Sequence, residues 1–243
     1  MLRKIVAGTV FTGLAIGGFA VPAANAATAA NGLLTINVPN VQVYKSAKCA
    51  DFPFTVKVNV PEGEEWAVVG ATQRVALDPS TRPVDWDVTM GTGPKTVRAT
   101  MRLCPKQDGV GAFTYVAAAV RETAPKADPE FLTVKSTLKS PSAATAIVTP
   151  KHVKKGKTIK ARGKVTYRTT SWAKRPIKKK AVTLQFQAVG TTTWTTVKTV
   201  KTTSNGGYSI KTKATTDGKY RVIYGGSSTI ARGVSAAAFI DVR

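Results

Sequence analysis

Histidine and acidic residues are scarce in this sequence, and each scarcity excludes a class of function. The 243 residues include one histidine, two cysteines, and 13 acidic against 36 basic residues, for a formal net charge of +23. A single histidine excludes a metal site built from several imidazoles and leaves His152 as the only imidazole base. His152 lies among charged neighbours in "TPKHVKKG", which favours a solvated side chain over a catalytic one.

Other constellations that carry chemistry are also missing. The segment "GVGAF" at 109–113 lacks the lysine and helix that complete a phosphate-binding loop. Carboxylates cluster in "PEGEEW" at 61–66 and in "VDWDV" at 84–88, and such groups can do acid–base work or hold calcium. In the second segment, however, alternation around the tryptophan indicates acidic side chains that face solvent on a strand. We therefore predict no enzymatic activity, no cofactor and no metal.

Long apolar runs are confined to the first residues. Arg3 and Lys4 precede the mostly apolar run at 5–21, and "ANA" ends at Ala26, so residues 1–26 are predicted to be a secretory signal peptide cleaved after Ala26. A membrane-anchoring helix is the alternative, but the run is short for a span. No later stretch approaches ~18 apolar residues, and the terminal "FIDVR" has no hydrophobic tail or sorting motif. We expect a product that is secreted, or held at the cell wall by non-covalent contacts.

The two cysteines, Cys49 and Cys104, agree with export. An even number of cysteines in an oxidising compartment indicates a disulfide. A catalytic or metal-binding thiol is the alternative, but the only histidine lies far along the chain. In the chain-entropy model a loop of this length would stabilise the fold by about 4 kcal/mol.

A change in composition near "LKSPSAAT" predicts two domains, 27–140 and 141–243. Residues 27–140 carry 13 basic and 11 acidic side chains, a net charge of +2, whereas residues 141–243 carry 21 basic and 2 acidic, a net charge of +19. A short linker near residue 140 explains both the punctuation and the change in charge. The second domain is strongly basic.

Both halves show strand-like alternation. In the second half, "AVTLQFQ", "GYSIKTKAT" and five further segments (143–149, 157–168, 193–201, 218–225 and 234–242) make seven expected strands separated by glycine-rich turns. The first half repeats the pattern in "LLTINV", "FPFTVKVNV", "WAVVGATQRV", "KTVRATMRL", "AFTYVAAAV" and "EFLTVKSTL". We expect no helix of useful length. The predicted fold class is all-β, with two immunoglobulin-like β-sandwich domains in tandem.

Two details refine that prediction. "TDGKYRV" at 216–222 resembles the tyrosine-corner segment of such sandwiches, which makes Tyr220 the expected corner; an ordinary Asp-Gly hairpin is the alternative. Cys49 precedes one strand of the first half, and Cys104 ends another. If these strands are the antiparallel neighbours B and E, the disulfide joins strand ends within one sheet.

The segments "GKTIKARGKVTYR", "VTLQFQ", "TWTTVKTVKTTSNGGYSI" and "DGKYRVIYGGSS" make residues 143–243 resemble the immunoglobulin-like modules of secreted actinobacterial proteins. The first half, with its two cysteines, is more loosely similar to another such module. The resemblance implies the fold and export. It implies no functional residue, because these modules serve as spacers, adhesive parts or wall-associated domains, and fold alone does not give function.

The stretch at 151–180 holds thirteen basic and no acidic residues. Along "KTIKARGKVTYR", one parity is apolar and the other is basic, so a strand here presents its cations on a solvent face. The strand "GYSIKTKAT" is the expected neighbour. Trp172 and Tyr167 could stack on bases or sugars, although two aromatics are few. The candidate polyanion-binding residues are Lys160, Arg162, Lys164, Arg168, Lys174, Arg175, Lys178, Lys179, Lys180, Lys211 and Lys213.

Two functions fit these residues. The first is a non-enzymatic envelope protein whose basic C-terminal domain contacts an anionic cell-wall polymer, while the N-terminal domain meets a protein partner of unknown identity. The second is a soluble secreted effector or ligand-binding protein whose basic face meets another polyanion or a host or competitor surface. Extracellular nucleic acid is a further candidate ligand, and a solvated basic surface that binds nothing is the alternative to all of them.

Overall fold

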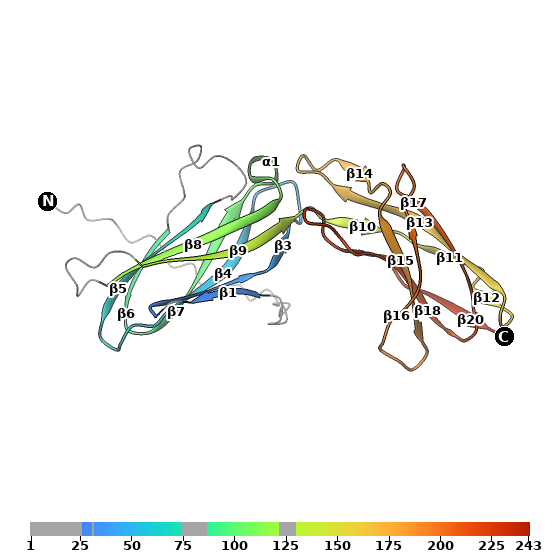
Figure 1. Cartoon of the computed structure of the whole chain (residues 1–243), viewed down its shortest axis with the longest axis horizontal. Coiled ribbons are helices and arrows are strands. Elements are labelled where there is room, and N and C mark those ends of the chain that lie inside the picture. Colours follow the sequence, from blue (N-terminus) through green and yellow to red (C-terminus); the bar gives the residue numbers. More distant parts are fainter. Residues whose placement is uncertain (1–25, 31, 74–86, 122–129) are drawn as a thin grey trace.

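The computed structural model describes residues 26–30, 32–73, 87–121 and 130–243. Within these residues the regular structure is almost entirely β-strand, and the only helix there is the single turn α1, Pro105–Asp108. Figure 1 shows the strands gathered into two groups, one from each half of the chain. The predicted signal peptide lies outside the described residues except for Ala26, where β1 begins, so it stays a prediction.

The described residues of the first half form nine strands. They are β1 (Ala26–Ala30), β2 (Leu34–Pro39), β3 (Val41–Val43), β4 (Ala50–Val58), β5 (Glu65–Gln73), β6 (Asp87–Thr92), β7 (Lys95–Leu103), β8 (Gly111–Arg121) and β9 (Glu130–Lys139). One sheet has the order β1-β2-β4-β7, and the other has the order β3-β9-β8-β5-β6. The short β3 runs parallel to β9, whereas the other pairs are antiparallel.

Eleven strands form the second half. They are β10 (Ser142–Ala144), β11 (Ile147–Thr149), β12 (His152–Val153), β13 (Thr158–Arg168), β14 (Lys174–Pro176), β15 (Ala181–Ala188), β16 (Thr195–Lys201), β17 (Gly207–Lys213), β18 (Gly218–Tyr224), β19 (Gly233–Val234) and β20 (Ala238–Val242). The long β13 pairs with β11 and β17, and also with β10 and β14 nearer its end. The opposite sheet has the order β12-β20-β18-β15-β16.

The two halves share one strand order. In immunoglobulin lettering, β2-β4-β7 and β11-β13-β17 are the A-B-E sheets, and β9-β8-β5-β6 and β20-β18-β15-β16 are the G-F-C-C′ sheets. In each half a short strand after A, β3 or β12, crosses to the second sheet and pairs in parallel with G. This order confirms the prediction of an all-β fold of the immunoglobulin-like sandwich type.

Each half has its own cluster of buried apolar side chains. In the first, Ile36 and Val56 from one sheet meet Trp66 and Tyr115 from the other. In the second, Ile159 and Ile210 from one sheet meet Leu184 from the other. Alternating strand residues supply these side chains, because successive residues of a strand point to opposite faces. Whether the halves fold separately stays a prediction.

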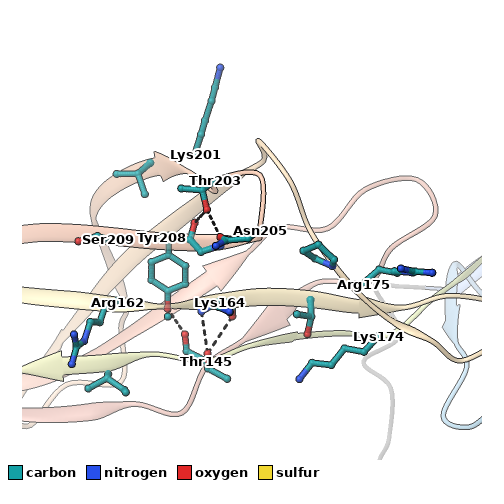
Figure 2. Close-up of a pocket in the computed structure, with 16 residues that line it drawn as sticks. Thr145, Arg162, Lys164, Lys174, Arg175, Lys201, Thr203, Asn205, Tyr208 and Ser209 are labelled. Atoms are coloured by element: carbon teal, nitrogen blue, oxygen red, sulfur yellow. Dashed lines mark hydrogen bonds between the residues drawn. The ribbon is translucent and has the colours of Figure 1, made fainter.

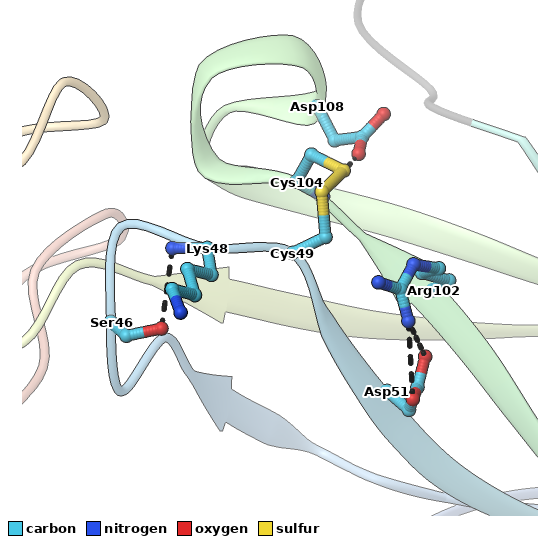
Figure 3. The surroundings of a disulfide bond; sticks show 7 residues. All are labelled: Ser46, Lys48, Cys49, Asp51, Arg102, Cys104 and Asp108. Carbon is cyan, nitrogen blue, oxygen red and sulfur yellow. Dashed lines mark hydrogen bonds and ion pairs between the residues drawn. A yellow bond between two sulfur atoms is a disulfide. The ribbon is translucent and has the colours of Figure 1, made fainter.

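The disulfide lies where strand pairing predicts it. Cys49 and Cys104 are bonded, with their Cα atoms 4.0 Å apart. Cys49 directly precedes β4 and Cys104 directly follows β7, and the adjoining residues Ala50 and Leu103 are paired across the two antiparallel strands. Figure 3 shows the bond at this end of the sheet, with the Arg102–Asp51 ion pair one position further along. The bridge therefore joins strand ends within one sheet, as expected.

The junction between the halves is ordered. Ser140, which is 4% exposed, donates its N–H to the Thr229 carbonyl at 2.9 Å, and its own carbonyl accepts from the Ala231 N–H at 2.8 Å. The Pro141 carbonyl accepts from the Arg168 N–H at 3.0 Å. The segment that we expected to be a linker is therefore hydrogen-bonded to the second half.

Trp172 adds a contact between the halves. It lies in the turn between β13 and β14 with a φ of 66°, its side chain is half-buried, and it packs against the apolar core of the first half. Its carbonyl accepts a hydrogen bond from Arg168 Nη1 at 3.2 Å. The Trp172 ring, a candidate for stacking on a ligand, thus packs between the two halves.

Helices of the described residues are too short and too polar to cross a membrane.

Candidate functional site

The site is built on β13, whose two faces differ as the sequence predicts. Ile159, Ala161 and Val165 are almost fully buried in the second core. The residues between them point to solvent, and Lys160 and Arg162 are exposed. Because the alternation persists along eleven residues, the solvent face of this strand carries a regular series of cations.

Neighbouring strands add cations in register. Lys213 stands opposite Thr158 and Lys211 stands opposite Lys160 on β17, while Lys174 of β14 stands opposite Arg168. All of these lysines are exposed. We call this set the cationic ladder. It comprises Lys160, Arg162, Lys164 and Arg168 of β13, Lys211 and Lys213 of β17, and Lys174 of β14.

An open groove of about 1060 Å³ lies over the middle of the ladder. Arg162, Lys164, Lys174 and Arg175 line it, together with Lys201 from the end of β16. On β17 the residues opposite Arg162 and Lys164 are Ser209 and Gly207. These small residues leave space above the sheet, so the groove forms where the neighbouring strand lacks long side chains.

Thr145, between β10 and β11, forms one wall of the groove. The Thr145 N–H donates to the Lys164 carbonyl at 3.0 Å, and the Lys164 N–H donates to the Thr145 hydroxyl at 3.1 Å. The Thr145 carbonyl accepts a hydrogen bond from the Tyr208 hydroxyl (Figure 2). The approach is so close that a Cβ at Gly163 would lie 1.8 Å from the Thr145 oxygen, so glycine is required at that position. Burial raises the pKa of Tyr208, which keeps the hydroxyl protonated as a donor.

The cations of the ladder have no carboxylate partner in their own half. Residues 141–243 contain two acidic residues, Asp217 and Asp241. Asp217 accepts a hydrogen bond from the Val242 N–H at 2.6 Å, and Asp241 pairs with His152 at 3.0 Å and with Arg243 at 2.9 Å. Every ion pair that the structure describes in this half involves Asp241. No ion pair that the structure describes in this half therefore neutralises a cation of the ladder.

The remaining candidates lie elsewhere or differ in role. Lys178, Lys179 and Lys180 are exposed on the segment between β14 and β15, outside the groove, and Thr202 holds this segment through backbone bonds to Lys179 and Lys180. Tyr167 packs against the second core. Of the eleven candidate residues, Arg162, Lys164, Lys174 and Arg175 line the groove. Lys160, Arg168, Lys211 and Lys213 belong to the ladder outside the groove. The three lysines at 178–180 belong to neither.

Sequence reasoning missed part of the groove. Lys201, Thr145 and Asn205 line it but were not candidates. Lys201 ends β16 in the opposite sheet, and only the fold brings it to the groove. Thr145 lies where the chain passes from β10 to β11, and the signal for it was Gly163, the one glycine on the buried parity of β13.

Other predicted candidates do not assemble into a site. His152 is exposed, with Asp241 as its partner, and hydrogen bonds from His152 and Arg243 lower the pKa of the Asp241 carboxyl. Among the described residues no three metal-ligating side chains come together. The segment at 84–88 lies mostly outside the described residues, so its proposed solvent-facing carboxylates stay a prediction.

Comparisons with known proteins describe only the general architecture. No protein-family model matches the chain, and no curated protein matches it. Among solved structures, the chain is similar to a red sea bream transglutaminase (15% identity, TM-score 0.38, 88% of this chain and 32% of that one). It is also similar to fibronectin(III)-like modules of Clostridium thermocellum CbhA (13%, 0.40, 86% and 95%) and to the D0-D1 domain of intimin (16%, 0.30, 83% and 94%). The chain spans about a third of the transglutaminase. Similarity this low carries no functional argument, and the assignment of the fold rests on the strand order.

Proposed function

We propose that this is a non-enzymatic exported protein whose second half binds an anionic polymer of the cell envelope through the cationic ladder and its groove. The observation that carries the proposal is the unneutralised ladder, in which Lys160 stands directly opposite Lys211 and neither lysine belongs to an ion pair that the structure describes in this half. Such a surface attracts phosphate or carboxylate polymers, because each contact releases condensed counterions.

Two separate arguments support export. The first is the predicted signal peptide at 1–26. The second is the Cys49–Cys104 disulfide, a bond that persists in oxidising compartments and is rare in the cytosol. The cationic ladder then supplies the contacts that retain the protein at the envelope, with the near-neutral first half available to another partner.

The test compares two surfaces of equal charge. In the ladder variant, Lys160, Arg162, Lys164, Lys211 and Lys213 are each replaced by Gln. In the control variant, five exposed lysines outside the ladder (Lys151, Lys154, Lys155, Lys198 and Lys219) are replaced by Gln. Binding to isolated cell-wall polymer is measured against salt concentration. The ladder variant should bind at least about tenfold more weakly, with a salt slope flattened by roughly 0.7–0.9 per lost contact.

Equal effects of the two variants would show that only net charge matters and would remove the site. The alternative of a soluble effector is tested on whole cells. Release from washed cells by about 0.5 M salt, where the screening length falls to about 4 Å, supports retention at the envelope. Full recovery in low-salt culture medium supports the effector.

A further inference from the structure

We propose that the ligand is an extended phosphodiester polymer whose phosphates are separated by six backbone bonds, with a three-carbon unit between them. It lies along β13 with its phosphates in step with the ladder. This inference rests on the proposed function and specifies its ligand. The observation behind it is the spacing of the cations.

Cations recur along the ladder at intervals of two residues. The rows defined by Thr158, Lys160, Arg162, Lys164 and Arg168 of β13 each carry at least one cation, supplied at Thr158 by Lys213 from the adjacent strand. Only the row of Thr166, which faces Pro176, has none, and Arg175 lines the groove next to it. Two residues of a strand advance about 6.6 Å, so the ladder spans roughly 33 Å.

This interval is close to the distance between phosphates in phosphodiester polymers that have six backbone bonds per repeat. Two residues of a strand contain six backbone bonds and extend by about 7 Å. A phosphodiester chain with three carbons between phosphates also has six bonds per repeat, of similar length. Its extended form therefore meets a cation at almost every phosphate. A chain with six carbons has nine bonds and a repeat of about 10 Å, so it meets roughly half as many rows.

Single-stranded nucleic acid has the same number of bonds between phosphates, but its bases need aromatic side chains to stack on. The aromatics near this surface are already occupied. Tyr208 is 6% exposed and its hydroxyl is bonded to Thr145, Tyr167 packs against the second core, and Trp172 packs against the first. The groove instead offers Ile147, which is 57% exposed, and threonine hydroxyls. These groups suit a small aliphatic or hydroxylated unit.

The experiment uses synthetic oligomers and the purified full-length protein. Fluorescently labelled phosphodiester oligomers of propanediol, of hexanediol and of deoxythymidine, with equal numbers of phosphates, are titrated at about 0.15 M salt. The propanediol oligomer should bind about tenfold more tightly than the hexanediol oligomer, because more phosphates reach a cation. It should also match the deoxythymidine oligomer to within about threefold, because the bases add no stacking.

Variants connect this preference to the ladder. Arg162→Gln with Lys164→Gln should remove most of the preference for propanediol over hexanediol. Lys154→Gln with Lys198→Gln, an equal loss of charge outside the ladder, should preserve it. Loss of the preference in both pairs would overturn the inference.

The other outcomes separate this inference from the proposed function. Equal binding of the propanediol and hexanediol oligomers would overturn the spacing and leave polyanion binding standing. Binding of deoxythymidine more than about tenfold tighter than that of propanediol would show base recognition and also overturn the inference. If no oligomer and no isolated wall polymer binds, the proposed function itself fails.

Discussion

Lys160 and Lys211 place two positive charges directly opposite each other on adjacent strands. Like charges in this position destabilise a sheet, whereas opposite charges stabilise it. The pair therefore favours ligand binding and disfavours folding. Stability and affinity should respond in opposite directions to a change at this row.

Replacing Lys211 by Glu should reveal that opposition. The new carboxylate faces Lys160, so the free energy of unfolding should rise by about 0.2–1 kcal/mol. Affinity for the anionic polymer should fall at the same time. Urea unfolding and a binding titration measure the two effects.

The control is Lys219→Glu, which changes net charge equally but stands opposite Gln187 and Phe239. It should stabilise less than Lys211→Glu. If both changes alter stability by the same amount, the cross-strand repulsion is not a local effect.

Two buried tyrosines predict a loss of stability in alkali. Burial raises the pKa of Tyr115 to about 12, against the opposing effect of its hydrogen bond with Gln42, and burial also raises the pKa of Tyr208. In the unfolded chain both hydroxyls ionise near pH 10. Above that pH the unfolded state has lost protons that the folded state still holds, so stability falls as pH rises.

Urea unfolding at several pH values measures this decline, which should begin near pH 10 and continue to about pH 12. Tyr208→Phe should make the decline shallower, although it also lowers stability near neutral pH by about 1–3 kcal/mol, because the Thr145 carbonyl loses its donor. A stability that stays constant between pH 9 and 12 contradicts the assignment.

At this scale, the sequence predicted the residues that lie on one strand and failed for those that several elements bring together. Alternation identified Lys160, Arg162 and Lys164 as one face, because the period of a strand is local. The role of Trp172 depends on the other half of the chain, and nothing local to its segment indicates that contact. In the second half, the tyrosine whose hydroxyl bonds to the main chain is Tyr208, whereas no described hydrogen bond involves the hydroxyl of Tyr220, the expected corner.

At the scale of elements, the two halves join the start of strand B to the end of strand E in different ways. In the first half, the start of strand B and the end of strand E are joined by the Cys49–Cys104 bond. In the second half, the corresponding ends of β13 and β17 are joined by backbone hydrogen bonds. The Gly156 N–H donates to the Ala214 carbonyl at 2.7 Å, and the Ala214 N–H donates to the Lys157 carbonyl at 3.0 Å. Only the first half should therefore respond to reduction.

Replacing both cysteines by serine should lower the free energy of unfolding of the first half by about 2–5 kcal/mol, because a loop in the unfolded chain is no longer constrained. The second half should unfold as before. Two variants with a single tryptophan separate the halves. Urea unfolding reports on the first half when only the buried Trp66 is kept and on the second half when only Trp194 is kept, with the other three tryptophans replaced by Phe in each case. Free thiols in the native, non-reduced protein would contradict the prediction.

The long strands were predictable and the short ones were not. Alternation over seven or more residues located β4, β7, β8 and β13 to within two residues of their ends. The strands β3, β12 and β14 contain three, two and three residues, which is too short for a period to emerge. In addition, β14 contains a proline, which lowers its propensity for a strand, and it forms because β13 offers it an open edge.

At the scale of the whole molecule, the two core clusters predict that the second half folds alone. The ordered junction sets the boundary: a fragment from Ser140 to Arg243 keeps the hydrogen bonds of Ser140 and Pro141 and all of β10. It should unfold cooperatively with a β-rich circular dichroism spectrum. A fragment that begins at Thr145 loses these contacts and should be less stable. If the longer fragment is unfolded, the halves depend on each other and the division into domains is wrong.

The parallel pairing of β3 with β9 and of β12 with β20 has a mechanical consequence. In each half one of the paired strands, β3 or β12, lies near the start of the sandwich's sequence, and the other, β9 or β20, lies at its end. Tension applied through those ends pulls the paired strands past each other along their length, and the hydrogen bonds between them share the load instead of opening one at a time. A protein anchored by one half and pulled through the other would resist extension at both of these parallel strand pairs. Its lifetime under tension would depend on the rate at which the two pairs separate.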